Sequence, residues 1–207
     1  MLDDPVDAMA RWSHGDLHTT ARLASGGRVT ALEVQEAVYA GKLQVHTDLA
    51  VDLPTTQADA EQLQQAFANL ISNACQAVTS MPQVPDRNGE LTGRLEITTQ
   101  FILDGQQSGP HIQVRFADNG PGIPPDIMPH IFEPFFTTKR LGQGTGLGLS
   151  ICDHIVRDHN GRIWAENNHL GGATLIMELP WVESASDPPA VAARAAHPVP
   201  IPRFRPR

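Results

Sequence analysis

The chain contains 207 residues, of which 41% are hydrophobic and 18% are charged, and its formal net charge at pH 7 is -8. This composition argues against a disordered or fibrous protein and predicts a soluble globular chain with one sizeable domain or two small ones. The negative charge argues against a nucleic-acid partner. Since no apolar run approaches the roughly 20 residues of a membrane span, we expect a cytoplasmic protein with no membrane segment.

Composition divides the chain into three regions. We expect a short helix and a linker in residues 1–40, a compact domain in residues 41–182, and a disordered tail rich in proline, alanine and arginine in residues 183–207. The two cysteines, Cys75 and Cys152, both fall inside helical patterns. They are predicted to be buried thiols in a reducing compartment.

Two elements are predicted before the main helix of the domain. A loose apolar spacing favours one short helix within residues 4–24, ended by Gly26 and Gly27. Partial alternation and β-rich content from residue 42 to residue 50 predict a strand.

The next element is a helix that follows Pro54 and continues to about Thr79, with Thr55 or Thr56 as its N-cap. At 100° per residue its apolar side chains share one face and a row of neutral amides lies opposite. The apolar face comprises Leu63, Phe67, Leu70, Ile71, Ala74 and Val78, and the amide face comprises Gln62, Gln65, Asn69, Asn73 and Gln76.

The amide face is unusual because a solvated helix face is normally rich in Glu and Lys. Asparagine is also a poor helix former, yet Asn69 and Asn73 lie four residues apart in NLISNACQAV. An amide offers a carbonyl acceptor and an amino donor, so it can ligate a hard cation or bond a phosphate. A polar surface that merely lacks charge is an equally good interpretation of this helix by itself.

The middle of the domain is predicted to contain a hairpin and a long loop. The segment MPQVPDRNGE after the helix favours turns, and residues 94–103 and 111–119 alternate as two strands. From Gly120 to Gly148 glycines and prolines leave room only for a short helical stretch near residues 126–132. A run of this length in a compact domain is typical of a functional lid.

The domain is predicted to end with one helix and two strands. The helix covers residues 148–161 and is closed by Gly161, and the strands cover residues 161–167 and 172–180.

Two glycine-containing motifs add chemical information. The sequence ADNGPGIP (117–124) places Asp118 at a strand end, before glycines that let the backbone approach a ligand closely. The sequence GQGTGLGLS (142–150) leads directly into a helix, whose free N–H groups and dipole favour an anion. Alone, the first motif is as typical of a β-turn and the second of a flexible linker, so their order after the amide helix carries the argument.

The amide helix, DNGPGI, IFEPFFTTK and GQGTGLGLS resemble the N, G1, F and G2 boxes of the ATP-binding domain of sensor histidine kinases. This group also includes the gyrase B, chaperone and mismatch-repair ATPases. The resemblance covers about Leu43 to Pro180, and IFEPFFTTK followed by GTGLGLS is most similar to the nitrogen-regulation type of kinase. It implies an α+β fold of the Bergerat type: a two-layer α/β sandwich with a mixed sheet, helices on one face and a mobile ATP lid.

The resemblance also implies roles for individual residues toward ATP and Mg²⁺. Asn73 would be the principal metal ligand with Asn69 assisting, and Asp118 would accept from the adenine amino group. Lys139 on the lid could reach the phosphates, with a merely solvated lysine as the equal alternative. Asn69, Asn73 and Lys139 are the predicted catalytic residues. Phe132, Phe135 and Phe136 would anchor the lid, and core packing of at least one of them is the alternative. The remaining implied nucleotide contacts are Gln76, Gly120, Gly122, Ile123, Phe132, Thr138, Gly144, Thr145, Gly146, Leu147 and Gly148.

The implied function is the ATP-binding catalytic domain of a two-component sensor histidine kinase, which transfers the γ-phosphate to a histidine. In the hydrolytic relatives a glutamate lies four residues before the metal-binding asparagine. Here that position is Asn69, which cannot act as a base, so free ATP hydrolysis is disfavoured. The alternative function is a non-catalytic nucleotide-binding module that regulates a partner.

The phosphoacceptor histidine is not identified by motif, because nothing in the chain resembles HExxNPL. Only His14 and His18 lie near the expected end, and Gly15 beside them is unfavourable in a long helix. Residues 1–40 are therefore expected to be the end of a truncated dimerisation hairpin with a linker, or an unrelated segment. The expected partners are a histidine-containing dimerisation domain or a partner kinase, and the receiver domain of a response regulator downstream.

Overall fold

The computed structural model describes residues 43–50, 53–54, 56, 58–80, 93–103, 109–139 and 144–181. The predicted helix within residues 4–24, the turn-rich break after the main helix and the predicted tail lie outside the described residues.

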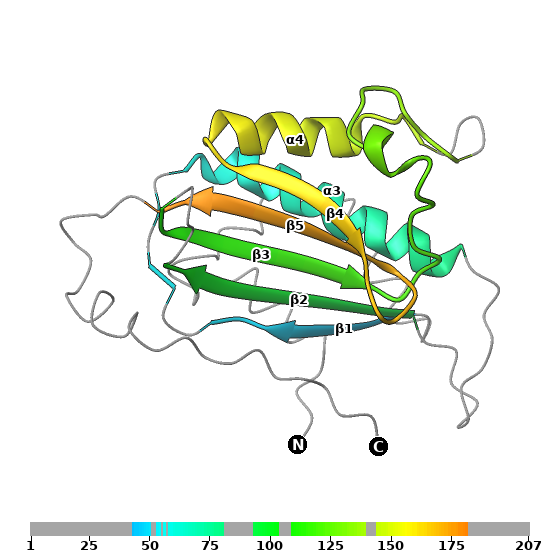
Figure 1. Cartoon of the computed structure of the whole chain (residues 1–207), viewed down its shortest axis with the longest axis horizontal. Helices are drawn as coiled ribbons and strands as arrows, with labels where there is room; N and C mark the ends of the chain where they lie inside the picture. Colours follow the sequence, from blue (N-terminus) through cyan, green and yellow to red (C-terminus); the bar gives the residue numbers. More distant parts are fainter. Residues whose placement is uncertain are drawn as a thin grey trace, which may run out of the picture.

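One five-stranded mixed sheet and two helices form the domain (Figure 1). The strand order is β1-β2-β3-β5-β4, with β1 parallel to β2 and every other neighbouring pair antiparallel. Both helices lie on the same side of the sheet and pack against each other. The predicted two-layer fold is therefore confirmed. The elements are β1 (Leu43–Asp48), α3 (Ala60–Thr79), β2 (Gly93–Ile102), β3 (His111–Asp118), a 3-10 turn (Met128–His130), α4 (Gly148–Asp158), β4 (Arg162–Asn167) and β5 (Ala173–Pro180).

The core lies between α3 and the inner face of the sheet. Four residues of the predicted apolar face of α3 are buried there, namely Phe67, Leu70, Ala74 and Val78, and the other two, Leu63 and Ile71, are partly buried against the core. The ring of Phe67 lies 5.7 Å from the ring of Phe116 on β3. Strand β2 alternates strictly in burial, which places Leu95 and Ile97 in the core. Cys75 and Cys152 form no disulfide and are buried, as predicted. This burial fixes the rotation of α3 and turns its amide face away from the sheet.

The N-terminus of α3 differs from the prediction. The N-cap is Asp59, whose Oδ1 accepts hydrogen bonds from the backbone N–H groups of Glu61 (2.9 Å) and Gln62 (3.2 Å). Thr56 instead donates its hydroxyl to the carbonyl of Pro180 on β5 at 2.8 Å. Thr56 was therefore wrongly predicted as a cap, because a tertiary bond uses its side chain; Thr55 lies outside the described residues.

The end of α4 also differs from the prediction. The helix ends at Asp158, and Asn160, not Gly161, adopts a left-handed conformation with φ of 56°. A Cβ atom on Gly161 would lie 2.2 Å from the carbonyl oxygen of Glu178. Gly161 donates its backbone N–H to the carbonyl of Val156 at 2.8 Å and so takes part in closing the helix, as predicted, while its lack of a side chain allows the close approach to β5.

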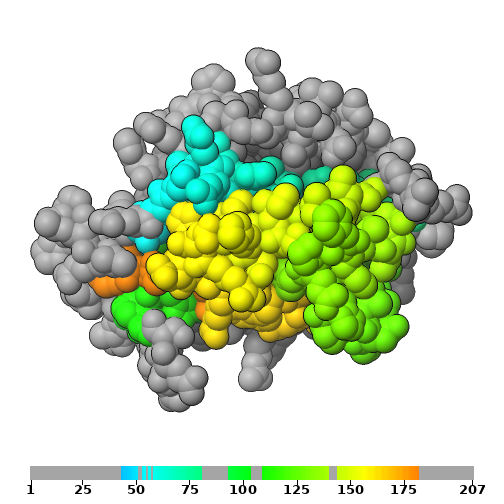
Figure 2. Space-filling view, turned by 90° about the horizontal axis from the view of Figure 1, so that it is seen from above, coloured from blue at the N-terminus to red at the C-terminus, as the bar shows by residue number. Residues whose placement is uncertain are grey.

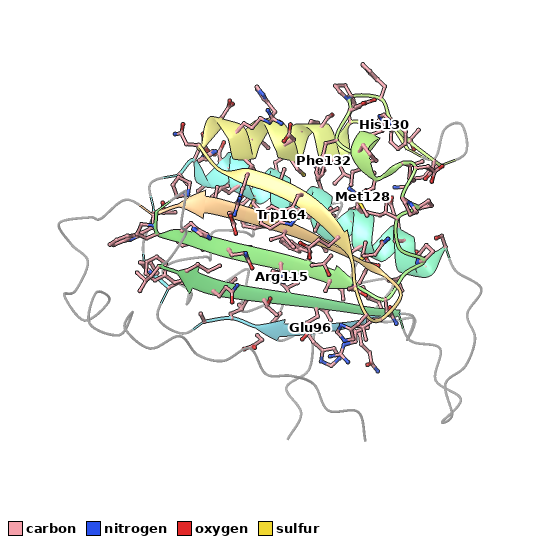
Figure 3. The ribbon with its side chains drawn as sticks, in the orientation of Figure 1. Glu96, Arg115, Met128, His130, Phe132 and Trp164 are labelled. Carbon is pink, nitrogen blue, oxygen red and sulfur yellow. The ribbon has the colours of Figure 1, made fainter. Side chains whose placement is uncertain are left out.

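The outer face of the sheet is covered by a polar network rather than by helices. Glu178 on β5 is only 5% exposed and accepts from Gln113 Nε2 at 2.7 Å and from Arg162 Nε. Arg115 and Trp164, labelled in Figure 3, belong to the same face. Across the described part of the chain, no helix is long and apolar enough to cross a membrane.

Candidate functional site

A cleft of ≈ 1090 Å³ lies between α3, the end of β3, the predicted lid and the start of α4. This volume suits a ligand of nucleotide size. In the view of Figure 2 the lid residues (light green) form a lobe beside α4 (yellow). The predicted site residues that line the cleft are Asn69, Asn73, Gln76, Asp118, Gly122, Ile123, Thr138, Lys139, Gly144, Thr145, Gly146 and Gly148. Gly120, Phe132 and Leu147 were predicted as contacts but do not line it.

The amide face of α3 reaches the cleft only in its C-terminal half. Asn69, Asn73 and Gln76 are half-buried and line the cleft, whereas Gln65 is exposed and Gln62 donates its side-chain amide to the carboxylate of Asp59. Of the five amides, the three that were predicted to contact nucleotide are thus the three that line the cleft. The lid and the end of β3 contact only the second half of the helix, and periodicity along the helix cannot show this limit.

The two asparagines meet the start of α4. Asn69 donates its Nδ2 to the carbonyl of Gly148 at 3.4 Å, which leaves Oδ1 as the atom available to a ligand. A Cβ atom on Gly148 would lie 3.6 Å from Nδ2 of Asn73. Within the described residues the Asn73 side chain makes no hydrogen bond, although it is half-buried in the cleft wall. Both amides are thus held where a ligand would enter between α3 and α4.

This donor set fits Mg²⁺ bound together with phosphate. Magnesium accepts amide oxygens in octahedral coordination and normally completes its shell with water and substrate phosphate oxygens. No group of three or more His, Cys, Asp or Glu side chains in the described part of the chain forms a metal site of another kind. Asn69 and Asn73 therefore supply few ligands, and a bound polyphosphate would have to supply others.

Asp118 is the buried acid of the cleft, with an exposed fraction of 4%. Its Oδ1 accepts from the backbone N–H of Gly120 at 2.8 Å and of Ala173 at 3.2 Å. Burial raises the pKa of this carboxyl above its usual value, and the two backbone hydrogen bonds offset only part of the effect. Since both bonds go to Oδ1, Oδ2 is the oxygen that can accept from a ligand amine.

The glycine-rich loop before α4 has the geometry of an anion site. The N-cap of α4 is Leu147, which provides no side-chain capping bond, so the first N–H groups of the helix point toward the cleft unpaired by a cap. Gly146 has φ of 67°, and a Cβ atom there would lie 2.4 Å from the backbone carbon of Phe135. Only glycine therefore lets this loop pass beneath the lid. Leu147 acts through its backbone position rather than by lining the cleft.

The three lid phenylalanines have different positions. Phe132 packs against the hydrophobic core, Phe136 lines the cleft, and Phe135 is 74% exposed with φ of 67°. In Figure 3 Phe132 lies near α4, and His130 lies at the outer edge of the lid. The prediction that Phe135 anchors the lid is wrong for this conformation, because its side chain points to solvent and only its backbone packs against Gly146. The alternative of core packing is confirmed for Phe132.

The lid is also joined to α3 by a polar contact. Lys139 donates its Nζ to Oε1 of Gln76, and its backbone N–H donates to Oγ1 of Thr137 at 3.2 Å. Gln76 in turn donates its Nε2 to Oγ of Ser72 at 3.2 Å. A cation is therefore held over the amide face, close to the start of α4.

The turn between β4 and β5 was missed from the sequence as part of the site. Ala173 lines the cleft and holds Asp118, and Leu175 also lines it. The only local signal was the glycine pair at 171–172 before β5, which is equally typical of a hairpin turn.

Comparison with known proteins identifies relatives of similar sequence. The sensory histidine kinase/phosphatase NtrB of Rhizobium leguminosarum bv. phaseoli is 31% identical over 196 residues, which cover 94% of this chain and 47% of that protein. The chain thus spans about half the length of this relative.

Solved structures with the same fold include the nucleotide-free catalytic domain of histidine kinase ThkA. It has 30% sequence identity and a TM-score of 0.56, and the match covers 75% of this chain and 92% of that domain. A structure of ThkA in complex with the response regulator protein TrrA has 29% identity and a TM-score of 0.53, with 75% of this chain and 39% of that chain covered.

The family itself is shown by a sequence profile. The profile of the histidine kinase-, DNA gyrase B-, and HSP90-like ATPases matches residues 58–183, which is more than half of the chain and includes the whole cleft. The chain therefore belongs to the histidine kinase-, DNA gyrase B- and HSP90-like ATPase family.

Proposed function

We propose that this chain is the ATP-binding catalytic part of a two-component sensor histidine kinase of the nitrogen-regulation type. It binds Mg-ATP in the cleft and presents the γ-phosphate to a histidine on a segment outside the described residues or on a partner chain. The observation that carries the proposal is the convergence of Asp118, the amides Asn69 and Asn73, and the uncapped start of α4 on one cleft.

Asp118 recognises the base in this proposal. Its free Oδ2 accepts a hydrogen bond from the exocyclic amine of adenine, while the N–H groups of Gly120 and Ala173 keep the carboxylate in place through Oδ1. Because the group is only 4% exposed, water competes weakly for this bond. The carboxylate therefore selects a base with an amino group at this position over one with a carbonyl.

Asn73 and Asn69 hold the metal, and the start of α4 holds the phosphates. Bound Mg²⁺ supplies charge neutralisation between the phosphate groups. The N–H groups at the N-terminus of α4 donate to phosphate oxygens, and the hydrogen bond from Asn69 to Gly148 fixes the α3 amide relative to that helix. Lys139 exchanges its bond to Gln76 for a phosphate oxygen when nucleotide is present.

The chemistry is transfer rather than hydrolysis. The imidazole nitrogen of the acceptor attacks the γ-phosphorus in line, the bond from phosphorus to the bridging oxygen breaks, ADP leaves, and the ring proton passes to solvent. In the lining of the cleft, positions 69 and 73 both carry amides, so neither provides a carboxylate that could activate water. An amide does not remove a proton from water at neutral pH, so turnover without an acceptor is slow.

Acceptor, partners and location belong to the same proposal. We assign the phosphoacceptor to a histidine-containing dimerisation domain or a partner kinase, with a response regulator receiver domain as the next acceptor, in a cytoplasmic setting. Support for the last step comes from the ThkA structure, which contains a response regulator. In this arrangement residues 41–182 are the kinase domain, and residues 1–40 and 183–207 are extensions.

The experiment is a calorimetric titration of the purified chain with a non-hydrolysable ATP analogue, with and without Mg²⁺. Saturable binding that strengthens with Mg²⁺ is expected, and absence of binding at millimolar nucleotide would refute the proposal. A second reaction then mixes the chain with the histidine-containing domain of an NtrB-type kinase and γ-labelled ATP. Label on that domain's histidine supports transfer, whereas binding without transfer to any such domain would favour the non-catalytic regulatory module.

A further inference from the structure

Two consecutive asparagines at the end of β4 contact the base-binding side of the cleft from outside. Asn167 is the last residue of β4, and Asn168 begins the turn to β5. Neither side chain lines the cleft, and neither belongs to the motifs that the sequence singled out. Both nevertheless bond to residues that do line it.

Asn168 uses the two ends of its amide for different purposes. Its Oδ1 accepts from the N–H groups of Leu170 (3.0 Å) and Gly172 (3.2 Å), which closes the turn. Its Nδ2 donates to the backbone carbonyl of Asp118 at 2.8 Å and to that of Ala173 at 3.0 Å. The acceptor thus makes the turn, and the donor ties that turn to the buried acid of the cleft.

The backbone around this tie is tightly packed. A Cβ atom on Gly172 would lie 2.1 Å from the carbonyl oxygen of Asp118 and 2.7 Å from its Oδ1. The next residue, Ala173, donates its N–H to the same Oδ1. The β4–β5 turn therefore holds both the carbonyl and the carboxylate of Asp118, and a glycine is needed for the turn to come close enough.

Asn167 holds the backbone of Ile123, a second residue that lines the cleft. Its Oδ1 accepts from the N–H of Ile123 at 2.7 Å and its Nδ2 donates to the carbonyl of the same residue at 2.8 Å. One side chain therefore satisfies both backbone groups of Ile123, which lines the cleft where the lid begins. A Cβ atom on the neighbouring Gly122 would lie 3.0 Å from Oδ1 of Asn167, so this contact also depends on close approach.

We propose that Asn168 and Asn167 are positioning residues that determine base selectivity: Asn168 fixes Asp118, and Asn167 fixes Ile123 against the opposite edge of the base. The inference rests on the proposed function, since it requires an adenine base against Asp118. It adds two residues that touch no nucleotide and act through the groups that do. Selectivity arises because a carboxylate that is held through Oδ1, on a backbone that is held through its carbonyl, cannot shift to accommodate a base that presents a carbonyl.

The divided roles of the Asn168 amide permit a specific test. The substitution Asn168→Asp keeps the shape of the side chain and the oxygen that closes the turn, but it removes the donor to Asp118. Asn167→Asp likewise keeps an acceptor for the Ile123 N–H and removes the donor to its carbonyl. The matched control is Asn160→Asp, which makes the same change of charge at an exposed turn residue beyond the end of α4.

The measurement is the ratio of the dissociation constants of ITP and ATP in the presence of Mg²⁺. The two nucleotides differ by a 6-oxo group in place of the 6-amino group and carry the same triphosphate, so the effect of an added charge on the triphosphate is the same for both and cancels in the ratio. A hydrogen bond to a charged group changes affinity by about tenfold or more, so we expect the native chain and Asn160→Asp to favour ATP by at least that factor. For Asn168→Asp the ratio is expected to fall to within about threefold of unity, and for Asn167→Asp to an intermediate value.

The outcomes separate this inference from the proposed function. If the native chain binds neither nucleotide, the proposed function fails. If the native chain selects ATP and both variants keep the native ratio, the positioning role is refuted, even where their overall affinity drops. Thermal unfolding identifies a variant that does not fold. If Asn168→Asp does not fold, the ratio of the dissociation constants of ITP and ATP in Asn167→Asp decides: an unchanged ratio overturns the inference, and a reduced ratio supports it.

Discussion

Replacing Asp118 by asparagine is expected to weaken nucleotide binding while leaving the fold intact. The side chain is 4% exposed, and its Oδ1 accepts from the N–H groups of Gly120 and Ala173. Asparagine keeps an oxygen for these two bonds but places an amino group where Oδ2 faces the ligand. A donor then opposes the adenine amine, and the bond to the base is lost.

The magnitude follows from the charge and burial of this bond. A hydrogen bond to a charged group contributes about 1.5–3 kcal/mol, and the low exposure of Asp118 leaves little screening by water. Since 1.4 kcal/mol corresponds to a factor of ten, the dissociation constant of the ATP analogue is expected to rise by about 10- to 150-fold.

Although Asp118→Asn weakens nucleotide binding, it is not expected to lower the stability of the folded chain. Burial raises the pKa of Asp118 above its usual value of 3.8. The folded state therefore binds this proton more tightly than the unfolded state, and its contribution to stability is lost as the pH rises from 3.8 through the raised pKa. At pH 7 the ionised carboxylate costs stability, so Asp118→Asn should leave the thermal midpoint unchanged or higher.

The assay combines calorimetric titration with thermal unfolding at pH 7. The control is Asp158→Asn, which removes the same charge from an exposed side chain at the end of α4. An Asp118→Asn chain that binds the analogue with native affinity would refute the assigned role. A midpoint well below that of the native chain would show that the carboxylate is needed for folding instead.

Three further changes test other parts of the site. Asn73→Asp should alter the free energy of Mg-ATP binding by about 1–3 kcal/mol without unfolding the domain. If the variant binds nucleotide as the native chain does, both with and without Mg²⁺, the result would count against the role of Asn73 as a metal ligand. Gly146→Ala should destabilise the loop by at least about 1–2 kcal/mol, because φ is 67° and the new Cβ meets the backbone of Phe135; a native midpoint and affinity would contradict the packing. Asp59→Ala should cost about 0.5–2 kcal/mol of unfolding free energy through loss of the α3 cap, with nucleotide affinity unchanged, and chemical denaturation measures it.

The helices, strands and motif residues could be predicted from the sequence wherever the signal is local. The apolar periodicity of α3, the alternation of β2 and the position of Asp118 at the end of β3 each depend on residues that are close in the sequence. Local chemistry was insufficient for the start of α3. Thr56 and Asp59 are both good N-caps, and the bond from Thr56 to Pro180, 124 residues away, takes the hydroxyl of Thr56 away from the helix, which Asp59 caps.

The sequence by itself therefore determined the family boxes, the sheet and most of the predicted residues that line the cleft. Only the tertiary structure decided that three of five amides reach the cleft, that Phe132 packs while Phe135 is exposed, and that Asn167 and Asn168 bond to Ile123 and Asp118. The physical reason is the range of the interactions. Hydrophobic periodicity and turn chemistry act between residues that are close in the sequence. The bonds of Asn167 and Asn168 instead join groups 44 and 50 residues apart, and they form only when the sheet has assembled with β5 between β3 and β4.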